Sequence, residues 1–122
     1  MGKRARKRSG TAGEAESLGL PSAIYTDQDG NELELRAALT LKARSEYASA
    51  LSGGLQREDA WQRATELLFE RLAVSWTISG LRTERQKELI GRYRMATADE
   101  RRFVRDSLRA HLAEHFPEME AP

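Results

Sequence analysis

The strongest constraint on the fold is an apolar pattern in residues 58–79. An α-helix turns once in 3.6 residues, so apolar side chains three or four positions apart share one of its sides. Two acids, Glu58 and Asp59, suit the positive N-terminal end of a helix, and Gly80 is a residue typical of its end. We therefore predict a central helix over residues 58–79. The residues that share its apolar side are Trp61, Ala64, Leu68, Leu72 and Trp76.

A shorter helix is predicted over residues 40–52. Thr40 can accept a hydrogen bond from a free backbone N–H of its first turn, and Gly53 and Gly54 follow its last turn. The composition agrees with helices, because alanine and leucine supply 32 residues whereas valine and isoleucine supply five.

Two further helix starts share the spacing of a capping box. In this pattern a Ser or Thr is followed three positions later by Glu or Gln, and each side chain bonds the backbone N–H of the other residue. Thr83 and Thr97 both have such a partner, Gln86 and Glu100 respectively. We predict helices over residues 84–95 and 98–116, the last ended by Pro117, which cannot continue a helix.

Residues 23–36 differ from the rest because leucine and glutamate alternate there after a turn rich in aspartate and glycine. Alternation with a period of two predicts a short β-hairpin, whose apolar face must pack on helices. The aspartates fit turn formation better than calcium binding, since an EF-hand loop needs more widely spaced oxygen ligands. The predicted fold is mainly α: one domain over residues 21–118, with about four helices behind this hairpin.

Residues 1–20 form a separate region by composition. The chain as a whole has a net charge of +1, yet five cations stand in its first eight positions. Such a segment, with few large apolar residues, predicts a disordered basic arm. Its ligand is left open between nucleic acid and an acidic protein surface, and a solvated tail is a third interpretation. The five cations are Lys3, Arg4, Arg6, Lys7 and Arg8.

Composition and hydropathy exclude several classes of protein. Cysteine is absent, which excludes disulfides, thiolate zinc sites and a cysteine nucleophile. The sequence has no apolar run of the length that spans a bilayer, and its basic start is not followed by the apolar core of a signal peptide. We expect a cytoplasmic protein without membrane contact.

One pattern suggests catalysis. His111, Glu114 and His115 match the His-x-x-Glu-His spacing of a zinc protease family, in which both histidines hold the metal. Only seven residues follow His115, which leaves little room for a further ligand. We interpret both histidines as residues at the edge of the apolar side of the last helix. No phosphate loop or nucleophile motif is present, so we expect a protein that is not an enzyme and has no metal or cofactor.

Arginines concentrate on the predicted helix at residues 98–116. With the preceding helix and the short turn at Met95–Thr97 they could form a helix-turn-helix, which makes a small DNA-binding protein an alternative function. The same arginines adjoin the apolar side of the helix and could cover it with their methylene groups. The candidate contacts to nucleic acid or an acidic partner are Arg101, Arg102, Arg105 and Arg109.

Three segments resemble a known family. They are Asp29–Arg36, the stretch from Ala60 to Ile78 that contains Val74-Ser75-Trp76-Thr77-Ile78, and the end of the last helix at Glu114–Glu118. Over residues 22–118 this arrangement resembles the small tail assembly chaperones of long-tailed, siphovirus-type bacteriophages. The resemblance implies a protein that binds the helical tape-measure protein and keeps it soluble until tail-tube subunits polymerise around it.

The apolar and aromatic side chains of the predicted helices are large anchors, either for a core or for a groove that accepts a partner helix. The resemblance makes the tape-measure protein the expected partner, with the tail-tube protein as a second. A structural subunit of a virion is another alternative. The candidate partner-binding residues are Trp61, Leu68, Leu72, Trp76, Tyr93, Phe103 and Leu108.

Overall fold

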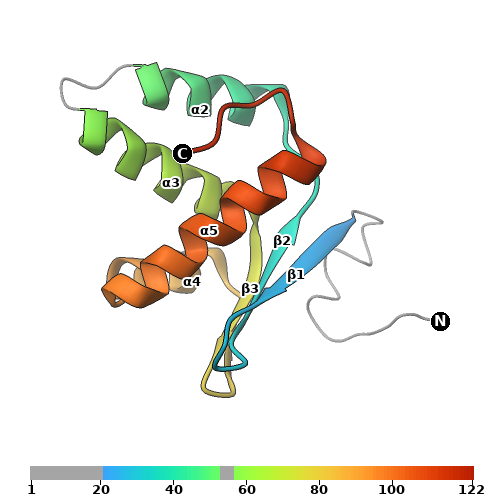
Figure 1. Ribbon diagram of the computed structural model, residues 1–122, viewed down its shortest axis with the longest axis vertical. Helices are drawn as coiled ribbons and strands as arrows, with labels where there is room; N and C mark the ends of the chain where they lie inside the picture. Colours follow the sequence, from blue (N-terminus) through green and yellow to red (C-terminus); the bar gives the residue numbers. More distant parts are fainter. Residues whose placement is uncertain (1–20, 53–56) are drawn as a thin grey trace.

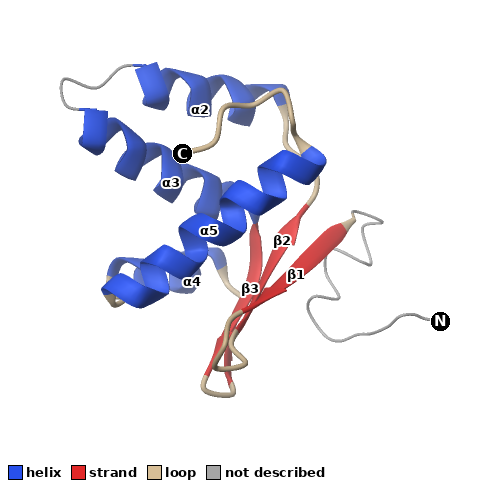
Figure 2. Ribbon diagram, viewed as in Figure 1, coloured by secondary structure: helices blue, strands red, loops and turns tan. Residues whose placement is uncertain are grey.

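The computed structural model describes residues 21–52 and 57–122, which repeat the order strand, strand, helix, helix (Figure 1). All four strands form one antiparallel sheet in the order β1-β2-β3-β4. The helices gather on one side of this sheet (Figure 2). The first set comprises β1 (Ser22–Thr26), β2 (Glu32–Arg36), α2 (Leu41–Ser52) and α3 (Arg57–Leu72). The second comprises β3 (Ala73–Ile78), β4 (Leu81–Thr83), α4 (Gln86–Arg94) and α5 (Ala98–His115).

The prediction of a mainly α fold is wrong, because the described residues form a mixed α/β domain. The predicted hairpin at residues 23–36 is confirmed, but it supplies only half of the sheet. The other half, β3 and β4, comes from residues 73–83, most of which were predicted to be helical. The face of the hairpin that carries Leu33 and Leu35 is buried against the helices. This agrees with the prediction, because an isolated two-stranded hairpin is only marginally stable.

The predicted helix over residues 58–79 is correct only as far as Leu72, and Ala73 begins strand β3 without an intervening loop. Trp76 fits both the helical and the strand period. It lies four residues after Leu72, as on one side of a helix, and two residues from Val74 and from Ile78, as on one face of a strand. Hydrogen bonding to β2 selects the strand, with Leu33 opposite Trp76 and a register shift between Glu34 and Leu35. A helix at 73–79 would leave that edge of β2 unpaired.

The two hairpin turns are built from different residues. Asp27 Oδ1 accepts from the backbone N–H groups of Asp29 and Asn31, at 2.8 and 3.0 Å. The predicted turn role is thus confirmed for Asp27. In the second turn Ser79 and Gly80 have positive φ angles of 52° and 80°, a conformation typical of two-residue hairpin turns. The Asn31 side chain joins the two turns, because its Oδ1 accepts from Ser79 N at 2.9 Å.

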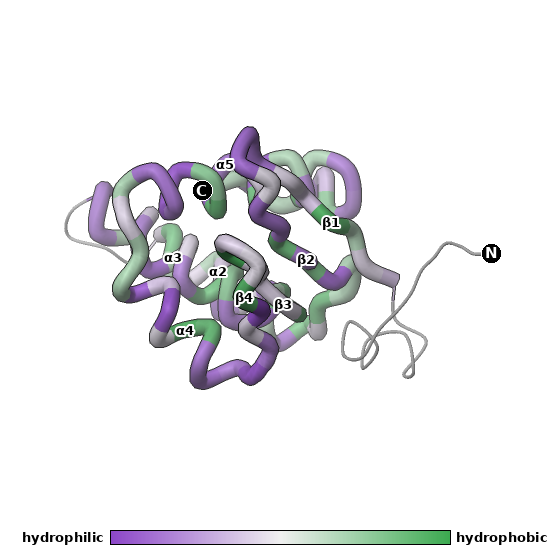
Figure 3. Tube along the Cα trace, turned by 90° about the horizontal axis from the view of Figure 1, so that it is seen from below, coloured by the Kyte–Doolittle hydropathy of each residue, from purple (hydrophilic) through white to green (hydrophobic). Residues whose placement is uncertain are grey.

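The core lies between the sheet and the helices and centres on Phe69 of α3. The Phe69 ring packs edge-on against Trp76, with centroids 5.6 Å apart, and stacks on Tyr93 of α4 at 5.0 Å. From the sheet, Leu33 and Leu35 are fully buried beside them. Hydrophobic and hydrophilic residues alternate along β2 (Figure 3), so one face of this strand contributes to the core.

The three predicted helix caps have different outcomes. Thr40 Oγ1 accepts from Ala43 N at 3.0 Å, as predicted. The capping box of α5 is also confirmed, since Thr97 Oγ1 accepts from Glu100 N at 3.1 Å and the Glu100 carboxylate accepts from Thr97 N at 2.9 Å. The box at Thr83 is wrong: Thr83 ends β4 opposite Trp76, and α4 begins after Arg85, which makes no side-chain cap.

These two similar threonines allow a direct test of the caps. Thr97→Ala is expected to lower the free energy of unfolding by about 1 kcal/mol, because a backbone N–H of α5 loses its acceptor. Thr83→Ala, the matched control, is expected to change it by less than about 0.5 kcal/mol, because Thr83 caps no helix. Urea unfolding of both variants measures the difference, and equal losses would contradict the assignment.

Candidate functional site

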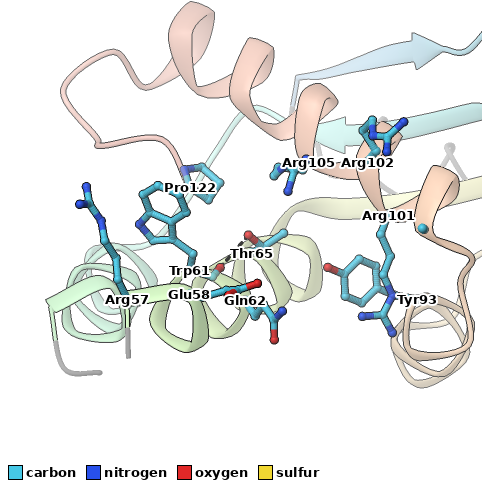
Figure 4. A pocket seen from close by; sticks show the side chains of 11 residues that line it. Arg57, Glu58, Trp61, Gln62, Thr65, Tyr93, Arg101, Arg102, Arg105 and Pro122 are labelled. Atoms are coloured by element: carbon cyan, nitrogen blue, oxygen red, sulfur yellow. Dashed lines mark hydrogen bonds between the residues drawn. The ribbon is translucent and has the colours of Figure 1, made fainter. Parts of the chain in front are cut away.

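A groove of about 650 Å³ lies between α3 and α5. Its two long walls come from the sides of these helices, and one residue of α4 and the last residue of the chain complete the lining (Figure 4). The lining residues are Arg57, Glu58, Trp61, Gln62, Thr65, Tyr93, Ala98, Arg101, Arg102, Arg105 and Pro122.

Helical spacing explains both walls. On α3 the side chains at Arg57, Trp61 and Thr65 follow each other at four-residue intervals and so lie above one another. They flank the buried side of the same helix, which carries Ala64 and Leu68. On α5 the residues from Ala98 to Arg105 that line the groove are three or four positions apart, beside its own buried side. Each helix thus presents one side to the core and a neighbouring side to the groove.

The groove contains two aromatic side chains, each with an arginine over its ring. The guanidinium carbon of Arg57 lies 5.0 Å from the ring centroid of Trp61, and that of Arg101 lies 5.2 Å from Tyr93. Figure 4 shows Trp61 toward one end and Tyr93 toward the other, with the Tyr93 hydroxyl directed into the groove. Burial raises the pKa of Tyr93, so this hydroxyl stays protonated at neutral pH. The groove therefore combines apolar surface, one hydroxyl donor and cations.

The electrostatic character of the groove is cationic, since four arginines and one glutamate line it. Two of these arginines form at most weak hydrogen bonds or ion pairs with other side chains of the described residues. Arg105 forms no hydrogen bond or ion pair with another residue in the described part of the chain. Arg102 approaches Asp99 only at 3.4 Å, and both side chains are largely exposed. Their charges are available to an anionic ligand.

Residues 117–122 return from the end of α5 toward α2 and reach the groove at Pro122. Arg44 of α2 forms an ion pair with Glu118, and the Tyr47 hydroxyl donates to the carbonyl oxygen of Glu120. Arg109 donates through Nε to the carbonyl oxygen of Pro122 at 2.9 Å. Arg109, a predicted contact residue, thus holds this segment in place instead of lining the groove.

The structure places the predicted partner-binding residues at the groove, beside the core or within the core. Trp61 is 36% exposed and lines the groove, and Tyr93 lines it although only 7% of its surface is exposed. Phe103 is half-buried against the core. The predicted contacts of the basic arm, residues 3–8, lie outside the described residues. The other four predicted residues are in the core, each 1% exposed or less: Leu68, Leu72, Trp76 and Leu108.

Several groove residues were not predicted from the sequence, above all Arg57, Gln62 and Thr65 on α3. The sequence contains a signal for this wall, because Arg57, Trp61 and Thr65 are four residues apart and therefore lie on one side of a helix, next to the apolar side that carries Ala64 and Leu68. That signal identifies a side of a helix. It does not indicate that the arginines of α5 face it, because this depends on how the two helices pack.

The histidine motif of α5 serves to join elements. His111 is fully buried, and its Nε2 lies 2.9 Å from the carbonyl oxygen of Arg36, so this nitrogen carries the proton. Its Nδ1 accepts from the Tyr25 hydroxyl at 2.8 Å. Burial lowers the pKa of His111, which keeps the ring neutral at pH 7. Both ring nitrogens thus have protein partners from the first hairpin, an arrangement that leaves His111 without a lone pair for a metal.

The fold and the groove define a small mixed α/β domain with a cationic interhelical groove. No family model, curated protein or solved structure matched the chain. Among the helices of residues 21–52 and 57–122, none is both long and apolar enough to cross a bilayer. The same residues contain no group of three or more acids and histidines arranged to hold a metal ion.

Proposed function

We propose that this chain is a non-enzymatic interaction protein that holds a long helical partner, as the phage tail assembly chaperones it resembles hold the tape-measure protein. The observation that supports this function best is the groove between α3 and α5, where exposed Trp61 stands among arginines. Apolar contact in the middle and charge complementarity at the rim provide specific, reversible binding without a cofactor.

The arrangement of the arginines favours a protein partner over duplex DNA. A recognition helix reads the major groove with an outward, convex surface. Arg101, Arg102 and Arg105 instead line a concavity that they share with α3. Arg101 also donates to the carbonyl oxygen of Arg94 at 2.8 Å, which holds it against the preceding helix. A helix-turn-helix mode would need these side chains on an open face of α5.

Co-expression with the tape-measure protein of the source phage or prophage tests this function. We expect the soluble fraction of the tape-measure protein to rise several-fold with the chain, because its apolar helical stripes become covered. An unrelated small protein produced at the same level is the control. An unchanged soluble fraction rules the chaperone function out, and finding the chain in purified particles favours the virion-subunit alternative.

A further inference from the structure

From the properties of the groove we infer the chemistry of its partner. The groove receives one face of an acidic amphipathic helix from another protein, and the apolar side chains of that helix pack against Trp61. This inference rests on the proposed function and gives it a site and a class of ligand. Three properties of the groove support it, namely its size, the nature of its walls and its charge.

The size of the groove suits a few side chains. Its α3 wall runs from Arg57 to Thr65 and its α5 wall from Ala98 to Arg105. At 1.5 Å per residue each wall is about 10–12 Å long, roughly two helical turns. A volume of about 650 Å³ is in the range of small-ligand pockets. The groove can therefore take the side chains that project from two turns of a helix, while the helix itself lies across the top.

The walls determine the backbone conformation of the occupant. Both are sides of α-helices, whose N–H and C=O groups bond within each helix except for the N–H groups of the first turn. The Thr65 hydroxyl also bonds internally, to the Trp61 carbonyl oxygen at 2.8 Å. An extended segment would find no strand edge to pair with and would bury unpaired backbone groups. A helix satisfies its own backbone and needs only side-chain contacts.

The charge of the groove selects acidic flanks on that helix. Arg57 and Arg105 form no ion pair within the described residues, Arg102 forms only the exposed one to Asp99 at 3.4 Å, and Glu58 is the one acidic side chain of the lining. Carboxylates on either side of the apolar side chains could pair with these guanidinium groups. The same charge opposes occupation by the chain's own residues 3–8, which are cationic.

Single-stranded nucleic acid fits this groove less well. Its binding sites stack successive bases on open aromatic faces. Here a guanidinium already lies over the ring of Trp61 and another over that of Tyr93, which is only 7% exposed. The groove therefore lacks a pair of free ring faces for two bases.

Binding of two synthetic helical peptides tests the inference on the full chain. Both peptides carry leucines at positions i, i+4 and i+7, and their flanking positions are all glutamate in one and all lysine in the other. We expect the glutamate peptide to bind at least about tenfold more tightly by fluorescence anisotropy, with an affinity that falls as salt rises. Equal affinity of the two peptides overturns the inference.

Variants then locate the binding. R102E/R105E reverses two charges of the groove and is expected to lower the affinity for the glutamate peptide by about tenfold or more. The matched control, R63E/K87E, changes the net charge equally at exposed positions outside the groove and is expected to bind as the parent does. W61A, which alters no charge, is expected to lower the affinity for both peptides. Parent-like binding by R102E/R105E and W61A overturns the inference.

Two other outcomes also overturn it. A single-stranded oligonucleotide that binds more tightly than the glutamate peptide, and loses affinity in R102E/R105E, identifies nucleic acid as the occupant. A concentration-dependent dimer that R102E/R105E abolishes identifies a second copy. The co-expression assay keeps this inference separate from the proposed function: if all variants solubilise the tape-measure protein like the parent, the function holds and the groove is not its site.

Discussion

Trp76→Ala is expected to lower the free energy of unfolding by about 3–5 kcal/mol, the range for truncation of a large buried aromatic residue. Trp76 is 1% exposed and packs edge-on against Phe69, and Arg92 lies over its ring at 5.5 Å from the centroid. It also lies opposite Leu33 in the central strand pair. Small domains are stable by only about 5–15 kcal/mol, so this loss would leave little stability.

Trp61→Ala is the matched control for this variant. Trp61 lies on α3 but is 36% exposed, and its truncation is expected to cost less than about 1 kcal/mol. Urea unfolding followed by far-UV circular dichroism measures both variants. Comparable losses in the two would contradict the placement of one tryptophan in the core and the other at the groove.

The second large effect concerns His111. His111→Ala is expected to cost roughly 3 kcal/mol at pH 7, because it leaves a cavity and removes the donor to the Arg36 carbonyl oxygen. The Tyr25 hydroxyl loses its acceptor at the same time. Tyr25→Phe, which removes only that second hydrogen bond, is expected to cost about 1 kcal/mol. A loss in His111→Ala no larger than in Tyr25→Phe would contradict the role of His111 in joining α5 to the hairpin.

The same residue makes stability depend on pH. Burial lowers the pKa of His111 below its ordinary value of 6.5, so as the pH falls through 6.5 the unfolded chain takes up a proton before the folded one does. Stability therefore decreases from pH 7 toward pH 5, by at most about 1.4 kcal/mol per pH unit for this one proton. Through their charges, Glu114 raises this pKa and His115 lowers it.

Two glutamine variants isolate this contribution. His111→Gln retains a donor and an acceptor but cannot titrate, so its stability is expected to change less than that of the parent between pH 7 and 5. His115→Gln leaves His111 in place and is expected to keep most of the decrease. Chemical unfolding at several pH values measures the slopes, and an undiminished slope in His111→Gln would show that another group titrates.

Local signals in the sequence were sufficient for some elements. The caps at Thr40 and Thr97 depend on residues within one helical turn, and both are formed as predicted. The turn at Asp27 likewise needs only its own side chain and its near neighbours. By contrast, Thr83 has the same spacing as Thr97 and caps no helix, because it pairs with Trp76 in the sheet.

The candidate site shows the same division. The arginines on one flank of α5 were predicted from the sequence, and three of them line the groove. On the opposite wall, from α3, only Trp61 was predicted, since the side of α3 next to its apolar stripe becomes a wall only when α5 packs across it. His111 was predicted at the edge of an apolar side. The structure places it at a contact between α5 and both strands of the first hairpin.

By itself, the sequence determined the turn of the first hairpin and the starts of α2 and α5, all through interactions between near neighbours. Tertiary structure alone decided that residues 73–78 form a strand, that Trp76 enters the core and that two helix flanks meet as a groove. The physical reason is that Trp76 fits a helical and an alternating pattern equally. Only hydrogen bonds to β2, some forty residues away, distinguish the two.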